Sequence, residues 1–373
     1  MHMKVKCCAI LVGAVMTLDA SGIEPSALDD ILQTAMVDMS LPGVRAAVHY
    51  PDGSLVTAAL GYADIENERP MDDNIGMPGG STGKSFFAAL TMLLVEDGTL
   101  SLDDPVSKWL GDFEWFHQLP NADTMQVRHL LAHTSGLQDY PNTFGYNTTM
   151  FWRALTKGSA YFTQEELIGY VTGRSARYAP GDGYLYSSDA GYLVLGRLIE
   201  AATGRDIYDL LEERILSPLA LTDIKPARNA VIEGVAAGYS RGARNLKADG
   251  RMKMDPRSEW TGGGLITTPT MLSRFFASLA NGSVVTPESF KKMLTEGFRG
   301  PESHLWRYGL GVFVFDGGES FGHEGMWPGY RSIVVHFFET GITIAVQTNR
   351  DGPVSLWKIV NEIAAESGQA QED

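Results

Sequence analysis

The stretch that decides the fold is residues 77–98, Met-Pro-Gly-Gly-Ser-Thr-Gly-Lys-Ser-Phe-Phe-Ala-Ala-Leu-Thr-Met-Leu-Leu-Val-Glu-Asp-Gly. Three glycines loosen the backbone around Ser81, and residues 86–95 are almost continuously apolar. Gly98 supplies the left-handed residue at which many helices end. Because a helix that is apolar on nearly every side has to lie inside the protein, the stretch predicts a buried helix with a serine at its start.

Ser81 and Lys84 form a candidate catalytic pair at the beginning of this helix. They are three positions apart, so both side chains lie on one face if the helix begins at or just before Ser81. A lysine whose pKa is lowered by apolar surroundings can take the serine proton and make the hydroxyl oxygen a nucleophile. The N–H groups at the helix start would stabilise an oxyanion. Serine and lysine also meet at this spacing by chance, so the pair alone is a weak signal.

Two other motifs overlap the same residues. Residues 79–83 satisfy the G-x-S-x-G pattern of the α/β-hydrolase nucleophile elbow, and residues 83–85, Gly-Lys-Ser, resemble the end of a phosphate-binding P-loop. Both motifs need a strand directly before them, and residues 67–76 have no strand pattern. A P-loop also needs a glycine where this chain has Pro78. The α/β-hydrolase remains an alternative to the serine–lysine interpretation.

Length and charge limit the possible organisation and partners. A chain of 373 residues exceeds what one hydrophobic core usually serves, so two lobes are expected. The composition, 44% hydrophobic and 20% charged, is that of an ordinary globular enzyme. A net charge of −15 disfavours nucleic acid and anionic membrane surfaces, which select basic patches.

The first 20 residues have the pattern of a secretory signal. Two lysines precede twelve uncharged residues, 7–18, which are too few to span a bilayer, and cleavage is expected after Ala20. We therefore expect a periplasmic or secreted protein without a stable membrane anchor, or a cytoplasmic one if the leader is retained. A vector-derived Met-His before a native Met3 is the alternative. Both cysteines, Cys7 and Cys8, lie in this leader, so no disulfide or thiol chemistry is expected beyond it.

The rest of the chain alternates between sheet and helix signals. Helical spacing is found at 25–39, 125–133, 163–172, 186–204, 268–280, 287–294 and 354–365, and strand patterns at 44–50, 55–62, 309–315, 330–338 and 342–349. An aromatic loop is expected at 140–162, serving either as a cap over a pocket or, as we prefer, as a small additional core. We predict an α/β fold of the α+β type, with an antiparallel sheet flanked by N- and C-terminal helices and a large, mostly helical insertion domain. Residues 24–98 and 266–366 would form the α/β lobe, residues 99–265 a helical lobe, and the active site would lie between them.

Four blocks, in order, resemble those of a known superfamily. They are Ser-Thr-Gly-Lys at 81–84, His-Leu-Leu-Ala-His-Thr-Ser-Gly-Leu at 129–137, Tyr-Ser-Ser at 186–188 leading into 191–200, and His-Glu-Gly at 323–325. The chain resembles, over residues 24–366, the serine β-lactamase and penicillin-binding-protein superfamily, in particular its class C, D-peptidase and family VIII esterase branch. Each block alone is weak evidence for the resemblance, and the four blocks in this order are strong evidence.

The resemblance implies a β-lactamase/transpeptidase-like fold and an acyl-enzyme mechanism. Ser81 would attack a carbonyl carbon, Lys84 and Tyr186 would share the role of base, and water would release the acyl group. The oxyanion hole would be the backbone N–H groups of Ser81 and Met326. Substrate would be positioned by Ser188, His323, Glu324 and Gly325. Neither a metal nor another cofactor is expected.

Three departures from the family pattern bear on the substrate. Ser188 stands where asparagine is usual, and a shift of one residue would put Asp189 there. His323 replaces the lysine of class C enzymes. A Glu324 carboxylate about 5 Å from a substrate anion would cost roughly 3 kcal/mol at an effective dielectric of about 20, unless strand alternation turns it away. These departures favour neutral esters and amides, or substrates with a free amine.

Other histidines have structural interpretations. His129 and His133 are four apart, like a metal-binding pair, but no acidic third ligand accompanies them. We expect them to shape the turn, and we expect His336 to be structural.

We predict a serine hydrolase that cleaves a small ester, amide or peptide through an acyl-enzyme, of the esterase or D-amino-acid amidase/peptidase type. One alternative is a penicillin-binding DD-carboxypeptidase or weak class C-like β-lactamase. Another is a non-catalytic penicillin-binding sensor. No nucleic-acid partner is expected, and the oligomeric state stays open.

Overall fold

The computed structural model describes residues 22–186, 189–298 and 306–368. The predicted leader, residues 1–20, lies outside them. The α-helices are α1 (Pro25–Met39), α2 (Lys84–Glu96), α3 (Ser107–Leu110), α4 (Val127–Leu131), α5 (Phe144–Lys157), α6 (Gln164–Gly169), α7 (Ala190–Thr203), α8 (Ile207–Leu211), α9 (Pro269–Ala280), α10 (Pro287–Thr295) and α11 (Leu356–Glu366). The strands are β1 (Gly43–His49), β2 (Leu55–Asp64), β3 (Arg69–Pro70), β4 (Met77–Pro78), β5 (Lys225–Pro226), β6 (Tyr239–Ser240), β7 (Ala243–Arg244), β8 (Leu265–Thr267), β9 (Trp306–Tyr308), β10 (Phe313–Phe315), β11 (Ser320–Trp327), β12 (Tyr330–Phe337) and β13 (Thr343–Thr348).

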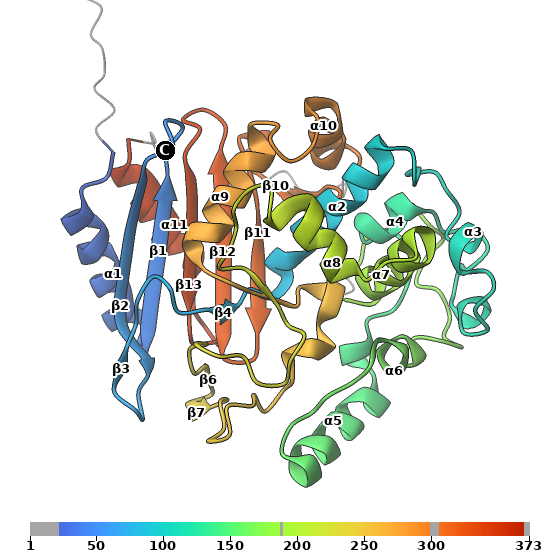
Figure 1. Cartoon of the computed structure of the whole chain (residues 1–373), viewed down its shortest axis with the longest axis horizontal. Coiled ribbons are helices and arrows are strands. Elements are labelled where there is room, and N and C mark those ends of the chain that lie inside the picture. Colours follow the sequence, from blue (N-terminus) through green and yellow to red (C-terminus); the bar gives the residue numbers. More distant parts are fainter. Residues whose placement is uncertain (1–21, 187–188, 299–305, 369–373) are drawn as a thin grey trace, which may run out of the picture.

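An eight-stranded sheet joins the two ends of the chain. Its order is β3-β2-β1-β13-β12-β11-β10-β9, so the N-terminal hairpin pairs with the last strand, with Val44 opposite Thr348. Helices α1 and α11 pack on one face, and α9 crosses the other (Figure 1). The predicted antiparallel sheet flanked by the N- and C-terminal helices is confirmed, with both helices on the same face.

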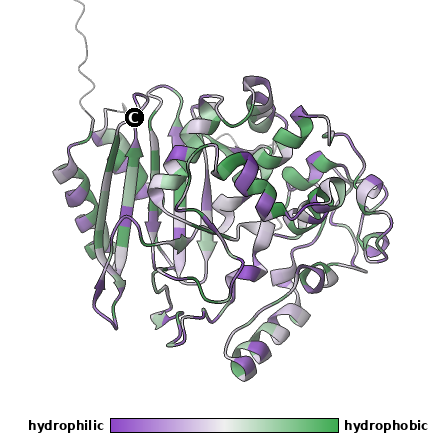
Figure 2. Ribbon diagram, viewed as in Figure 1, coloured by the Kyte–Doolittle hydropathy of each residue, from purple (hydrophilic) through white to green (hydrophobic). Residues whose placement is uncertain are grey.

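The central strands are apolar on both sides because both faces of the sheet are covered. On β12, Val334 packs with the core around α2 and α9, whereas Ile333 and Val335 pack with α1 and α11. This alternation is the period-two geometry of a strand buried on both faces. Hydrophilic and hydrophobic residues alternate around α1 (Figure 2), as expected for a helix with one face on a sheet.

The buried helix predicted from the opening stretch is α2. Ten of its residues, from Lys84 to Leu94, are buried, and the Phe86 ring stacks on that of Phe275 in α9 with centroids 3.6 Å apart. Ser81 lies just before this helix, in the 3-10 turn η1 (Gly80–Gly83), because α2 itself begins at Lys84.

The prediction of a loop at 140–162 is wrong for residues 144–157, where the chain forms α5. Thr143 caps this helix, its hydroxyl accepting a hydrogen bond from the Tyr146 N–H. Threonine, asparagine and aromatic residues have low helix propensity, which hid the helix in the sequence. Two further differences concern strands: β10 is shorter than predicted, and no separate strand was predicted at β11.

The predicted helices between residues 99 and 265 are present with shorter bounds, as α4, α6 and α7. The division into lobes at residues 98 and 266 stays a prediction. Within the described ranges, none of the helices combines the length and apolarity needed to cross a bilayer.

The core around α2 supports a first prediction. Phe86→Ala removes a fully buried ring and should lower the free energy of unfolding by about 3–5 kcal/mol, measured by urea denaturation. Phe144→Ala is the matched control, because Phe144 is 87% exposed and the change should cost less than about 0.5 kcal/mol. Equal losses in the two variants would contradict the placement of Phe86 in the core.

Candidate active site

Ser81 and Lys84 meet at the junction of η1 and α2. Lys84 is fully buried, and its Nζ donates a hydrogen bond to Ser81 Oγ at 2.8 Å and another to the Gly262 carbonyl at 2.5 Å. Gly80, directly before Ser81, has a φ of +57°, which suits glycine, and it lets η1 approach β11, because a Cβ there would lie 2.5 Å from the Met326 nitrogen. The chain therefore brings together the pair that the S-x-x-K pattern predicted.

Asp189 completes the surroundings of Lys84. Its Oδ1 lies 2.8 Å from Lys84 Nζ, and its Oδ2 accepts a hydrogen bond from the Tyr140 hydroxyl at 2.9 Å. Asp189 stands directly before α7, whose first residue is Ala190. Ser188, the predicted substrate-binding residue at the preceding position, lies outside the described residues. Asp189 is thus the acidic partner of the candidate catalytic lysine.

The ion pair reverses one expectation about Lys84. Burial disfavours the charged ammonium, but the attraction of Asp189, followed by that of Tyr186, outweighs burial and raises the pKa of Lys84. The condition for Lys84 to act as the base, a pKa lowered by apolar surroundings, is not met, because Asp189 stands within ion-pair distance. Lys84 is therefore a cation in the resting site.

Tyr186 lies beside the pair. Lys84 Nζ is 5.6 Å from the centre of the Tyr186 ring, and the His133 ring packs on it with centroids 4.3 Å apart. Burial raises the pKa of Tyr186, while the Lys84 charge and a hydrogen bond with Ser81 partly offset that rise. The resting site therefore holds a neutral phenol next to a charged ammonium.

Strand β11 supplies the opposite wall of the site. Strand β10 pairs with β11 only from Ser320 to Gly322, so the edge of β11 beyond Gly322 is left to face η1. Gly325 is required there, because a Cβ would come within 1.9 Å of the Gly79 carbonyl oxygen. This close packing brings the Met326 nitrogen next to Gly80, the residue before Ser81. The arrangement fits the predicted oxyanion hole of Ser81 and Met326 N–H groups, which stays a prediction.

The residues of the His-Glu-Gly block face in different directions. His323 is fully buried, Tyr308 Oη lies 3.0 Å from its Nε2, and burial lowers its pKa to about 3, so the ring is neutral. It is not among the residues that line the cavity beside Ser81, whereas Glu324 and Gly325 are. Glu324 is exposed at the rim, where it accepts a hydrogen bond from Trp357 Nε1. Substrate-binding roles for His323, Glu324 and Gly325 stay predictions.

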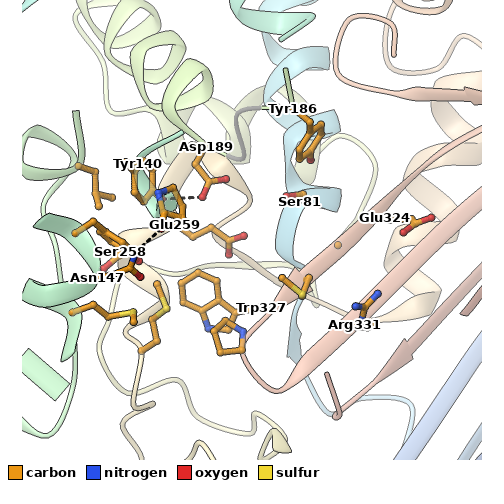
Figure 3. Close-up of a pocket in the computed structure, with 18 of the residues that line it drawn as sticks. Ser81, Tyr140, Asn147, Tyr186, Asp189, Ser258, Glu259, Glu324, Trp327 and Arg331 are labelled. Atoms are coloured by element: carbon orange, nitrogen blue, oxygen red, sulfur yellow. Dashed lines mark hydrogen bonds between the residues drawn. The ribbon is translucent and has the colours of Figure 1, made fainter. Parts of the chain in front are cut away.

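A cavity of about 860 Å³ opens beside Ser81 (Figure 3). Its wall is mainly apolar and aromatic, and includes Tyr140, Tyr146, Met150, Met254, Phe313 and Trp327. Part of the aromatic segment at 140–162 thus does cap a pocket. Trp260 is not among the lining residues, because its ring is buried against Gly196 of α7.

The two histidines of the 129–137 block do not form a metal pair. His129 Nδ1 accepts a hydrogen bond from the Gln126 N–H at the start of α4, whereas His133 is buried against Tyr186 and Tyr192. Within the part of the chain that the structure describes, no group of three potential ligands is close enough to hold a metal ion.

Comparison with known proteins agrees with this geometry. The model of the Beta-lactamase family matches residues 28–369. The chain belongs to the Beta-lactamase family. Penicillin-binding protein 4* of Bacillus subtilis is 26% identical over 79% of this chain and 65% of its own length, and esterase EstB of Burkholderia gladioli is 30% identical over 56% and 52%. The crystal structure of D-amino acid amidase from Ochrobactrum anthropi SV3 superposes with a TM-score of 0.75 and 27% identity, over 91% of this chain and 97% of that one.

Sequence reasoning missed two charged residues in the cavity of this Beta-lactamase-family protein. Glu259 is 3% exposed, and Arg331 on β12 is the cross-strand partner of Met326. The alternation of β11 and β12 could have indicated Arg331, because it pairs with the residue after His-Glu-Gly. No periodic pattern marks Glu259, which precedes a glycine-rich turn.

The Lys84–Asp189 pair predicts an alkaline pH profile. Since the pKa values of Lys84 and Tyr186 are both raised, the proton that must leave this pair is lost only at high pH. We expect kcat/KM for p-nitrophenyl butyrate to rise from about pH 7 to about pH 10 without a plateau, after correction for uncatalysed hydrolysis. Asp189→Asn removes the main attraction on the Lys84 charge, so its profile should level off at lower pH.

The matched control is Asp182→Asn, which removes an exposed carboxylate from the same segment and should keep the wild-type profile. A wild-type plateau near neutral pH, or identical profiles for Asp189→Asn and the wild type, would contradict the assignment of a cationic Lys84.

Proposed function

We propose that this protein is a serine hydrolase that cleaves small esters or amides through an acyl-enzyme on Ser81. The observation that carries the proposal is the 2.8 Å hydrogen bond from Lys84 Nζ to Ser81 Oγ, made beside Tyr186 at the wall of an apolar cavity. The esterase and amidase names among its relatives support the same chemistry.

The charges of the site indicate which group takes the serine proton. Because Asp189 and the Gly262 carbonyl hold Lys84 as a cation, the reactive form is the one in which Tyr186 has lost its proton. Ser81 Oγ attacks the carbonyl carbon as its proton passes to the Tyr186 oxygen, and the carbonyl oxygen becomes the oxyanion. Tyr186 then donates that proton to the leaving group, and the carbon–leaving-group bond breaks. Water repeats the sequence to free Ser81.

The size and lining of the cavity favour a substrate with a small, largely apolar acyl group. Its volume of about 860 Å³ and its aromatic wall suit a substrate with an apolar side chain more than an extended polar polymer. A second candidate is a DD-carboxypeptidase or weak β-lactamase, and Arg331 favours it. Arg331 lines the cavity and forms no ion pair within the described residues, so its guanidinium offers a site for a substrate carboxylate.

Export of the protein belongs to the proposal as well. The charge and hydropathy pattern of residues 1–20 supports secretion or a periplasmic location. Comparison of the N-terminal sequence of the protein purified from culture medium or periplasm with that of the cytoplasmic fraction tests it.

A panel of substrates tests the proposed function. We expect turnover of p-nitrophenyl butyrate or an amino-acid amide, slower turnover of a D-Ala-D-Ala peptide and nitrocefin, and no turnover by Ser81→Ala. That variant should unfold within about 0.5 kcal/mol of the wild type, because it removes one small, partly exposed group. Lys84→Ala should lower kcat/KM by about 10³-fold or more.

Each competing assignment has its own outcome in this panel. Full activity in Ser81→Ala would overturn the proposal, and full activity in Lys84→Ala would favour an α/β-hydrolase mechanism. Stoichiometric acylation by nitrocefin without turnover of any substrate would identify a penicillin-binding sensor instead.

A further inference from the structure

Glu259 is a buried carboxyl group that none of the catalytic steps uses. It stands directly before the 3-10 turn η6 (Trp260–Gly262), and its side chain is directed into the cavity between Asp189 and Trp327 (Figure 3). The residue is 3% exposed. Across the described ranges, its carboxyl group makes no hydrogen bond and no ion pair, although its oxygens border the cavity.

The carboxyl group lies near the nucleophile. A Cβ placed on Gly263 would come within 2.8 Å of Glu259 Oε1 and within 2.2 Å of the Gly80 carbonyl oxygen. Gly80 directly precedes Ser81, so a group bound to Glu259 would sit close to the carbonyl that Ser81 attacks. Position alone therefore makes Glu259 a candidate for recognising the acyl part of a substrate.

An unpaired buried carboxylate is energetically unfavourable. Burial, followed by repulsion from Asp189, holds the pKa of Glu259 well above its usual range, with the Lys84 charge only partly offsetting both. Lys84 cannot serve as its partner, because its ammonium already contacts Ser81, Asp189 and the Gly262 carbonyl. Without a cationic partner, the protonated form of Glu259 is therefore favoured.

The other charges of the cavity leave room for a cation at this end. Its lining holds three acidic residues, Asp189, Glu259 and Glu324, and one basic residue, Arg331. In Figure 3 Glu259 and Arg331 lie on opposite sides of Ser81. The rings of Tyr146 and Trp327 line the same cavity, and aromatic faces attract cations. Because Lys84 already pairs with Asp189, Glu259 is the carboxyl group at this end that could lose its proton and pair with a cation from a ligand.

We propose that Glu259 binds a positively charged ammonium group on the acyl part of the substrate. The proton of Glu259 leaves to solvent when the ion pair forms, and the carboxylate then accepts hydrogen bonds from the ammonium group. This inference rests on the proposed hydrolase function. It narrows the substrate class to esters or amides with a free amine close to the scissile carbonyl, as in derivatives of α-amino acids.

Paired substrates that differ only in charge test the proposal. We would measure kcat/KM for alanine p-nitroanilide and N-acetylalanine p-nitroanilide, each as both enantiomers, and take the ratio of free to acetylated substrate. The wild type should prefer the free amine by at least about tenfold. Glu259→Gln, which keeps shape and removes charge, should lower that ratio by about ten- to a hundredfold.

Asp182→Asn is the matched control, because it removes an exposed carboxylate that does not line the cavity. It should change the ratio by less than about threefold, since an exposed charge is screened by solvent. An equal fall in both variants would show a general negative potential and would overturn the specific role of Glu259.

A second measurement on the wild type needs no variant. Benzylamine should inhibit the hydrolysis of p-nitrophenyl butyrate at a concentration at least about tenfold lower than uncharged benzyl alcohol. Equal inhibition, or equal turnover of free and acetylated anilides alongside active ester hydrolysis, would overturn the cation site and leave the hydrolase intact. Failure to hydrolyse any ester, amide or anilide would overturn the hydrolase and this inference together.

Discussion

The ion pair between Lys84 and Asp189 is the interaction on which the rest of the site depends. Its lysine end is fully buried, its carboxylate end is 14% exposed, and it joins α2 to the residue before α7, 105 positions later in the chain. Removal of either partner would leave an uncompensated charge inside the protein, which is strongly destabilising. Asp189 also accepts a hydrogen bond from the Tyr140 hydroxyl. One carboxylate therefore positions both the lysine and part of the aromatic wall of the cavity. Ser81 takes its place in this framework through its hydrogen bond from Lys84.

The sheet provides the second constraint. Because β10 stops pairing with β11 at Gly322, the remaining edge of β11 meets η1 rather than another strand. The Ser332 hydroxyl strengthens this contact, donating a hydrogen bond to the Gly79 carbonyl at 2.5 Å. Backbone groups of β11 therefore come close to the nucleophile without any loop that would have to order on substrate binding. The position of Met326 follows from strand pairing, and so it is rigid.

The same geometry explains what the sequence could and could not show. The apolar run of α2, the hairpin of β1 and β2, and the terminal helices depend on local periodicity, which a sequence displays directly. The Ser81–Lys84 contact is equally local, because three positions of helical backbone bring the side chains together. The Asp189 and Glu259 contacts depend on elements that are far apart in the sequence, and no spacing rule reports them. Helix α5 was not predicted for another reason. Its residues have weak helix propensity, and its cap stabilises it only once it has formed.

The pKa of Lys84 shows why burial alone is a poor guide to chemistry. Apolar neighbours predict a neutral amine, yet one carboxylate at 2.8 Å is enough to keep the ammonium charged, since desolvation and ion pairing act in opposite directions and pairing prevails. The same lysine cannot neutralise a second carboxylate. Asp189 pairs with the lysine, whereas burial and repulsion from Asp189 raise the pKa of Glu259, although both carboxyl groups face the same cavity. The two carboxyl groups thus differ because only Asp189 reaches the lysine. Glu259, which does not, can respond to the charge of a ligand.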